Sequence, residues 1–169
     1  MPFLTLLRHA KAAPPLPGQE DFDRPLTERG RTDAARMTKV LDGLGLDLAL
    51  VSSAARTIET WNIVSAGLAA PLPATAEHSL YLCHASHLIE RLRAVTPDIQ
   101  SIVAVGHNPC LQEVALWLAG KTEAPGVDQM RDKFPTCAVA TFELTTGRWS
   151  DLTPKSVIFK RFAAPRTLD

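Results

Sequence analysis

The sequence predicts a three-layer α/β/α domain, in which helices cover both faces of a mostly parallel sheet that has an antiparallel C-terminal edge. Short continuous apolar runs, which suit strands buried on both faces, alternate with longer amphipathic segments that suit helices. Turn-forming residues separate these segments. Near the C-terminus the pattern changes to alternating segments around Thr-Thr-Gly, which is typical of an antiparallel hairpin.

The first elements are a strand, a long loop and a helix. Residues 3–7 form an apolar run, and the proline-rich stretch from Ala10 to Leu26 cannot continue a helix or a strand. Loops longer than about 12 residues are more often lids or binding loops than simple connections. Thr27 is expected to cap a helix that runs to about Leu41. The pattern predicts that this helix buries Ala34, Ala35, Thr38 and Leu41 and turns Arg29, Arg31, Asp33, Arg36 and Lys39 to water.

The next elements repeat the alternation of strand and helix. Residues 48–51 predict a buried strand, after which Ser52 and Ser53 offer side-chain oxygens to cap a helix over residues 54–66. A short strand over residues 74–76 and a helix over residues 85–95 follow. The helix is expected to stop at Thr96-Pro97, because the residue before a proline disfavours helical geometry.

The last third begins with another apolar strand over residues 101–105. Asn108 is expected at the N-cap and Pro109 at the first position of the following helix, which ends near Leu118. The antiparallel hairpin is expected to pair residues 136–144 with residues 148–152, and residues 157–162 suit a final edge strand.

Composition limits the class of protein. A chain of 169 residues, 46% hydrophobic, suits one domain spanning residues 1–169, and no boundary or repeat interrupts it. Basic and acidic residues both number 18, so the net charge is zero and nucleic acid is not an expected partner. No apolar run approaches the ~20 residues that cross a bilayer, which excludes a membrane span. The N-terminus lacks signal-peptide features, which predicts a cytoplasmic protein.

The cysteines predict neither a disulfide framework nor a metal site. The three cysteines form no Cys-x-x-Cys pair, and their odd number argues against a framework. Cys83, His84 and His87 lie close in sequence but lack a fourth nearby ligand, so the two histidines are expected to be solvated. Cys110 lies in the first turn of a predicted helix, where it is either a low-pKa thiol or a small buried residue.

Residues with chemical potential follow three of the predicted strands. Arg8 and His9 follow the first strand, Arg56 lies in the helix after the second, and His107 follows residues 101–105. Because ligands collect outside the carboxyl ends of parallel strands, these side chains are expected to meet. A helix N-terminus and two guanidinium forks favour a dianion such as phosphate. An imidazole inside such a site is a candidate nucleophile.

The order of these motifs resembles that of the histidine phosphatase superfamily. Residues 6–12, Leu-Leu-Arg-His-Ala-Lys-Ala, resemble its Arg-His-Gly signature, with Ala10 in place of the usual glycine. Residues 24–30, residues 51–60 and residues 105–109 look like the later family blocks in the same order. The ending is similar to that of the small SixA-type phosphohistidine phosphatases.

The resemblance implies a phosphoglycerate mutase-like fold and an enzyme that works without a cofactor or metal. His9 would take the phosphoryl group, Arg8 and Arg56 would clamp it, and His107 would complete the pocket. Phosphoryl transfer needs in-line placement and charge neutralisation, which these residues supply. We expect a carbonyl to accept a hydrogen bond from the other ring N–H of His9, and we expect His107 to be protonated once a dianion binds.

Three further residues are candidates for the site. Asn108, in the Gly-His-Asn-Pro motif, is a candidate substrate-binding residue. Arg24, at the end of the long loop, is expected either to reach the substrate or to pair with Asp21 or Asp23. These two carboxylates lack the further oxygen ligands that a metal site needs. Glu77 follows the third predicted strand and is either a proton donor or an exposed loop carboxylate.

The predicted activity is hydrolysis of phosphohistidine carried by a protein, such as a protein of a phosphorelay. The conjugate acid of imidazole has a pKa of about 6.5, so imidazole leaves more easily than an alkoxide and needs less help from an acid. A small-molecule phosphomonoesterase of the same superfamily is the alternative, and a mutase is less favoured. A non-catalytic phosphate-binding or phosphoprotein-binding module would have no need of both His9 and His107.

Overall fold

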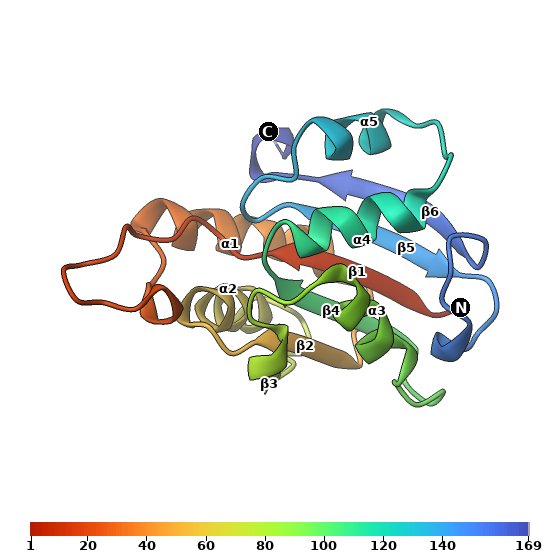
Figure 1. Cartoon of the computed structure of the whole chain (residues 1–169), viewed down its shortest axis with the longest axis horizontal. Coiled ribbons are helices and arrows are strands. Elements are labelled where there is room, and N and C mark those ends of the chain that lie inside the picture. The colour runs from red at the N-terminus through yellow and green to blue at the C-terminus, as the bar shows by residue number, and fades with distance from the viewer. Residues whose placement is uncertain (169) are drawn as a thin grey trace.

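The computed structural model describes residues 1–168, and its centre is a six-stranded sheet in the order β3-β2-β4-β1-β5-β6 (Figure 1). The first four strands in sequence run parallel, and the last two are antiparallel additions at one edge, as predicted. The strands are β1 (Phe3–Arg8), β2 (Leu48–Ser52), β3 (Ala74–Glu77), β4 (Ser101–Gly106), β5 (Val139–Leu144) and β6 (Val157–Ala163).

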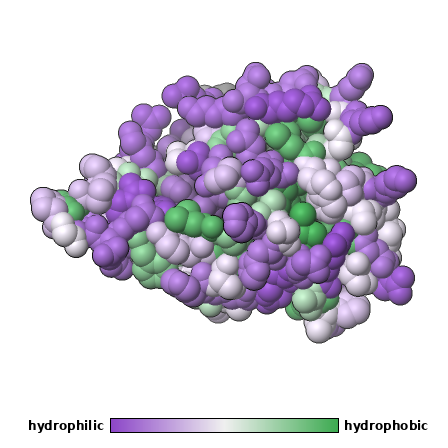
Figure 2. Space-filling view, in the orientation of Figure 1, coloured by the Kyte–Doolittle hydropathy of each residue, from purple (hydrophilic) through white to green (hydrophobic). Residues whose placement is uncertain are grey.

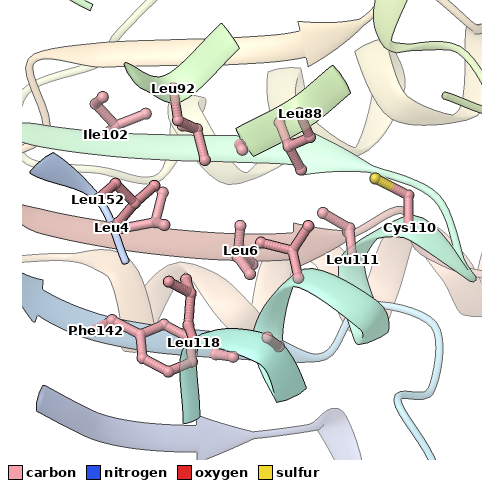
Figure 3. Close-up of a cluster of buried hydrophobic side chains, with 14 of the residues drawn as sticks. Leu4, Leu6, Leu88, Leu92, Ile102, Cys110, Leu111, Leu118, Phe142 and Leu152 are labelled. Carbon is pink, nitrogen blue, oxygen red and sulfur yellow. The ribbon is translucent and has the colours of Figure 1, made fainter. Parts of the chain in front are cut away.

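Helices cover both faces of this sheet, which confirms the predicted three layers. The helices α1 (Glu28–Leu41) and α2 (Ala55–Ala66) pack on one face, and the other face is covered by α3 (Ala85–Arg93), α4 (Cys110–Ala119) and α5 (Pro125–Asp132). Neighbouring residues of β1 serve opposite faces, because side chains alternate along a strand. Leu6 packs with Leu111 of α4 (Figure 3), whereas Leu7 belongs to the core beneath α1 and α2.

Helix α1 begins as predicted and buries Ala34 and Leu41 as predicted, but its buried face is shifted. The Thr27 hydroxyl accepts a hydrogen bond from the Gly30 N–H at 3.0 Å and caps the helix. The predicted burial of Ala35 and exposure of Asp33 are both wrong. Asp33 tolerates burial because it lies near the guanidinium groups of Arg29 and Arg36. The buried stripe follows residues three or four positions apart, namely Gly30, Ala34, Met37 and Leu41.

Two predictions at helix starts are wrong. Ser52 and Ser53 do not cap α2, whose N-cap is Ala54 without a side-chain hydrogen bond. Asn108 does not cap α4, since Pro109 occupies the N-cap position and the bond between them is cis. Ser52 and Asn108 instead have hydrogen-bond partners elsewhere in the fold, at the site described below, and the Ser53 hydroxyl is buried without a partner among the described residues.

The C-terminal third differs from the prediction in two elements. Residues 148–152 do not form the second hairpin strand; instead β6 pairs with β5, and Trp149–Asp151 forms a 3-10 turn. The turn buries the Trp149 ring, whose Nε1 donates a hydrogen bond to the Ile99 carbonyl at 2.7 Å. Helix α5 is absent from the sequence prediction, and it buries Val127 and Met130 against the sheet.

The surface is mostly polar. Hydrophilic residues cover most of the face shown in Figure 2, and apolar residues form small separate groups on it. Within residues 1–168, no helix is both long enough and apolar enough to span a membrane. The loop between β1 and α1 projects from the body of the domain (Figure 1) and carries a short 3-10 turn at Asp21–Asp23.

Candidate active site

Two histidines meet at the carboxyl ends of the two central parallel strands. His9 follows β1 and His107 follows β4, and the two strands pair in register up to Arg8 and Gly106. The His9 N–H continues this ladder by donating to the Gly106 carbonyl at 3.1 Å. The centroids of the two imidazole rings lie 5.3 Å apart, and both residues are buried. The predicted meeting of the two motifs is therefore confirmed.

His9 is held as a neutral ring with one nitrogen free. Its Nδ1 lies 2.7 Å from the Ala10 carbonyl oxygen, which can only accept, so Nδ1 carries the proton and Nε2 keeps its lone pair. A carbonyl in this role is expected from the sequence. Burial first, and then the charges of Arg56, Arg8 and Arg24, lower the pKa of His9 to about 4 against the opposing effect of that hydrogen bond. The ring is a neutral candidate nucleophile at pH 7.

His107 is neutral at pH 7 for related reasons. Burial first, then the repulsion that two protonated imidazole rings would feel, and then the charge of Arg56, lower its pKa to about 3. Its Nε2 lies 2.8 Å from the Ser52 hydroxyl, which can donate or accept and so suits either tautomer. Its Nδ1 is buried and has no hydrogen-bond partner within residues 1–168. A bound dianion would raise this pKa, so protonation of His107 on phosphate binding stays a prediction.

Arg8 and Arg56 bring two guanidinium groups to the same place. The side chain of Arg56 is only 3% exposed. The pKa of Arg8 is lowered first by the burial of Arg8 and second by the positive charge of Arg56. Arg8 donates from Nη1 to the Phe134 carbonyl at 2.9 Å. The Nε atoms of both arginines are buried without a partner among the described residues. Buried donors with no acceptor are costly, so an oxyanion that accepts from them is strongly favoured here.

The long loop places a carboxylate directly on Arg56. Asp21 accepts from Arg56 through its Oδ2 at 3.0 Å and through its backbone carbonyl at 2.8 Å. The Tyr81 hydroxyl donates to the same Oδ2 at 2.5 Å, and Arg24 donates to Oδ1 at 3.0 Å. The hydrogen bond from Tyr81 first, and then the hydrogen bond and charge of Arg56 and the charge of Arg24, lower the pKa of Asp21 to about 2 against the opposing effect of burial. The Asp21 carboxylate therefore contacts the guanidinium predicted to hold phosphate.

Arg24 forms an ion pair with Asp21, and within residues 1–168 it forms none with Asp23. It also donates from Nη1 to the Ala13 carbonyl at 3.0 Å. The ion pair within the loop, one of the two alternatives expected for Arg24, is therefore confirmed. Its charge nevertheless contributes to the low pKa of His9. Arg24 thus lies close enough to the site to add positive potential to it, and direct contact with a substrate stays a prediction.

Sequence reasoning misses Tyr81, which closes one side of the site. The Tyr81 ring meets the His107 ring edge to face at 5.5 Å, and the Arg56 guanidinium lies 5.8 Å from its centroid. Phe22 of the long loop packs edge to face on Tyr81 at 5.0 Å. Tyr81 is the only tyrosine of the chain, and this is the one signal that could single it out in a segment without periodicity.

Asn108 lies beside Arg8 because both bind one backbone carbonyl. The Asn108 side-chain amide donates to the Phe134 carbonyl at 3.0 Å, as Arg8 does. The Asn108 Oδ1 atom is buried and has no partner within residues 1–168. The structure therefore brings Asn108 to the site, although its contact with a substrate stays a prediction. The Phe134 carbonyl is a second feature that sequence reasoning misses, since a backbone group leaves no residue pattern.

Glu77 ends β3 and is bound by an arginine. Both of its oxygens accept from the Arg91 side chain at 2.7 to 3.0 Å, and its side chain is 19% exposed. It is therefore neither a fully exposed loop carboxylate nor a group with free oxygens. The role of proton donor stays a hypothesis, and this ion pair makes that role harder to fulfil.

The cysteines and the remaining histidines do not form a metal-binding cluster within residues 1–168. Within residues 1–168, no three side chains of His, Cys, Asp or Glu gather in a way that could hold a metal ion. His84 and His87 are exposed, as expected. The sulfurs of Cys83 and Cys110 lie 3.7 Å apart. The Cys83 thiol and burial raise the pKa of Cys110, so the low-pKa alternative for Cys110 is wrong and the small buried residue is confirmed.

Asp21→Asn should strengthen binding of phosphate, because it removes a negative charge that contacts Arg56 and repels the phosphate anion. We expect the inhibition constant for phosphate, measured against an aryl phosphate substrate, to fall about fivefold, a modest effect since the Asp21 side chain is 48% exposed. Asp23→Asn is the matched control, because it removes the same charge from the same loop. Weaker inhibition by phosphate in Asp21→Asn would show that Asp21 supports the anion site instead of competing with phosphate.

Fold and site together define an α/β protein in which two histidines and two arginines gather at the carboxyl edge of the sheet. Residues 4–81 match the family model of the histidine phosphatase superfamily (branch 1). An uncharacterized protein of Mycobacterium tuberculosis is 32% identical over 164 residues, an alignment that covers 95% of this chain and 100% of that protein. The chain belongs to the histidine phosphatase superfamily.

Solved structures agree with this assignment. A protein of Nakamurella multipartitia, provisionally named phosphohistidine phosphatase SixA, has a TM-score of 0.82 and 26% identity, and the match covers 97% of this chain and 96% of that one. A protein of Agrobacterium tumefaciens with the same provisional name has a TM-score of 0.80 and 27% identity, with 98% and 99% covered. The fold is phosphoglycerate mutase-like, and the chain is a SixA-like, histidine-phosphatase-type protein, as the resemblance implies.

Proposed function

We propose that the protein is a phosphatase that hydrolyses phosphohistidine carried by another protein, through an intermediate phosphorylated on His9. The observation that carries this proposal is the hydrogen bond from His9 Nδ1 to the Ala10 carbonyl, which leaves Nε2 unprotonated beside two arginines. An anion site without turnover would have no use for a ring held in this tautomer. The similarity to SixA-type proteins supports the same activity.

The reaction proceeds in two transfers. In the first, the substrate ring carries a proton on its second nitrogen. The lone pair of His9 Nε2 attacks phosphorus in line, and the P–N bond to the substrate ring breaks with its electron pair, so that ring leaves as neutral imidazole while the phosphorylated His9 ring, protonated at Nδ1, takes up the positive charge. Arg8 and Arg56 stabilise the charge on the equatorial oxygens, and His107 donates to the phosphoryl group once it is protonated. In the second transfer, water attacks the phosphorus of phospho-His9, the P–N bond breaks, and phosphate and neutral His9 are released.

The leaving group favours phosphohistidine over an alkyl ester. An alkoxide needs a proton from an acid as it departs, whereas imidazole, whose conjugate acid has a pKa of about 6.5, needs little help. Glu77 and Asp21 are the two carboxylates considered as proton donors, and each accepts hydrogen bonds from an arginine. A small-molecule phosphomonoesterase, the second candidate, would have to free Glu77 from Arg91.

The test is a panel of a phosphohistidine protein, an aryl phosphate and an alkyl phosphate, each assayed with and without EDTA. We expect the first two substrates to turn over much faster than the alkyl phosphate, because without a strong acid the rate depends steeply on the pKa of the leaving group. We expect EDTA to leave all rates unchanged. Loss of activity with EDTA, restored by zinc or magnesium, would contradict the proposed mechanism.

Glu77→Gln separates the two candidate functions within the same panel. We expect hydrolysis of the phosphohistidine protein to stay within a few-fold of the wild-type rate. The matched control is Glu90→Gln, which removes another carboxylate paired with an arginine, Arg93, on helix α3. If Glu77→Gln alone abolishes cleavage of an alkyl phosphate that the wild type hydrolyses well, Glu77 is the proton donor and the protein acts on small phosphoesters.

A further inference from the structure

A basic groove opens beside the candidate active site, on the same edge of the sheet. Its volume is about 520 Å³, and Arg8 lines it, so the groove and the phosphate site share a wall. The other cations along it come from four separate segments of the chain, namely Lys11, Arg29, Lys133 and Arg166. These four residues are exposed. We call this surface the basic groove.

The charge of the basic groove is not balanced. The chain has no net charge, yet among residues 1–168 the groove is lined by five cations and one carboxylate, Asp33. That carboxylate is largely buried and lies 3.7 Å from Arg29 and 3.9 Å from Arg36. Lys11, Lys133 and Arg166 form no ion pair within residues 1–168. Arginines elsewhere on the surface, such as Arg131 and Arg148, pair with nearby carboxylates.

The backbone fixes the positions from which the cations of the groove extend. The Lys11 carbonyl accepts from the Thr27 N–H at 2.9 Å, and α1 approaches so closely that a Cβ on Gly30 would lie 2.3 Å from this carbonyl oxygen. Lys133 directly precedes Phe134, whose carbonyl holds Arg8. Arg166 lies in a 3-10 turn (Pro165–Thr167). Unpaired like charges held together repel one another, and an anionic partner relieves that repulsion.

We infer that the basic groove is a second anion subsite, which binds carboxylate side chains of the protein substrate while its phosphohistidine occupies the neighbouring site. This inference rests on the proposed function. An open groove lined by exposed, separated cations suits several acidic side chains of a protein surface better than one compact second phosphate. Such contacts act mainly on encounter and affinity, so they affect KM more than kcat.

The test neutralises three cations of the groove that lie outside the catalytic group, in the variant Lys11→Gln/Lys133→Gln/Arg166→Gln. We compare kcat/KM for an acidic phosphohistidine protein with kcat/KM for a small aryl phosphate. The ratio should fall at least tenfold through a higher KM for the protein, and the salt dependence of that KM should weaken. The variant Lys39→Gln/Lys121→Gln/Lys155→Gln is the control, since it removes equal charge from other exposed positions. Thermal unfolding checks that both variants fold.

The outcomes separate the inference from the function on which it rests. If the wild type hydrolyses the phosphohistidine protein and the ratio is unchanged in the groove variant, the groove inference alone fails. An equal fall for both substrates also overturns it, because the cations then only add potential to the phosphate site. Inhibition by a small bisphosphate that is lost in the variant, with the ratio unchanged, would assign the groove to small molecules. If the wild type leaves phosphohistidine proteins intact, the proposed function fails and the inference fails with it.

Discussion

Replacement of His9 by alanine should lower kcat by a factor on the order of 10³ or more, because a nucleophile that forms a covalent intermediate has no substitute in the site. His9 is the ring whose Nε2 is left free by a hydrogen bond at Nδ1. The measurement is turnover of an aryl phosphate and of a phosphohistidine protein. His84→Ala, at an exposed position, should retain wild-type turnover.

The same experiment identifies the phosphorylated residue. Rapid quenching of the wild type during turnover should trap a phosphate that is stable in base and labile in acid, and peptide mapping should locate it on His9. His9→Ala should trap none. Label on a serine, an aspartate or a cysteine would show that another residue is the nucleophile, and would overturn the proposed intermediate.

Replacement of Arg56 by alanine should lower kcat/KM by about 10² to 10³, the usual cost of losing a preorganised donor to transition-state charge. Arg56→Lys should recover only part of this loss, because an ammonium group keeps the charge but lacks the planar fork that matches phosphate oxygens. Inhibition by vanadate should weaken in parallel. Arg131→Ala, which removes an exposed arginine, is the control. If Arg56→Ala keeps both its inhibition by vanadate and its kcat/KM within a few-fold of wild type, Arg56 is not part of the phosphate site.

Sequence patterns predict the parallel core of the fold well, because continuous apolar runs have few other uses in a domain of this size. Residues 3–7 and 101–105 become β1 and β4 almost to the residue. Predictions fail where a contact with a residue distant in sequence determines the local structure. Trp149 forms a turn because its indole reaches the Ile99 carbonyl. Ser52 leaves α2 uncapped because its hydroxyl reaches His107, a residue 55 positions away.

The site divides in the same way. His9, Arg8, Arg56 and His107 are predictable because each follows a strand, and parallel strands bring their carboxyl ends to one edge. The contacts that organise these residues are not predictable, since they come from the loop carboxylate of Asp21 and from backbone carbonyls. A carbonyl is present at every residue, so only the fold determines which one orients a catalytic ring.

The two buried neutral histidines also link the folding equilibrium to acidity. In the unfolded chain each imidazole would titrate near its ordinary value of about 6.5, whereas the folded pKa values of His9 and His107 are about 4 and about 3. Between these values the unfolded chain binds more protons, so the free energy of unfolding decreases as the solution becomes more acidic. We expect a bound oxyanion to raise the pKa of His107 and so to oppose this loss. Acid and phosphate therefore act in opposite directions on the stability of the native state.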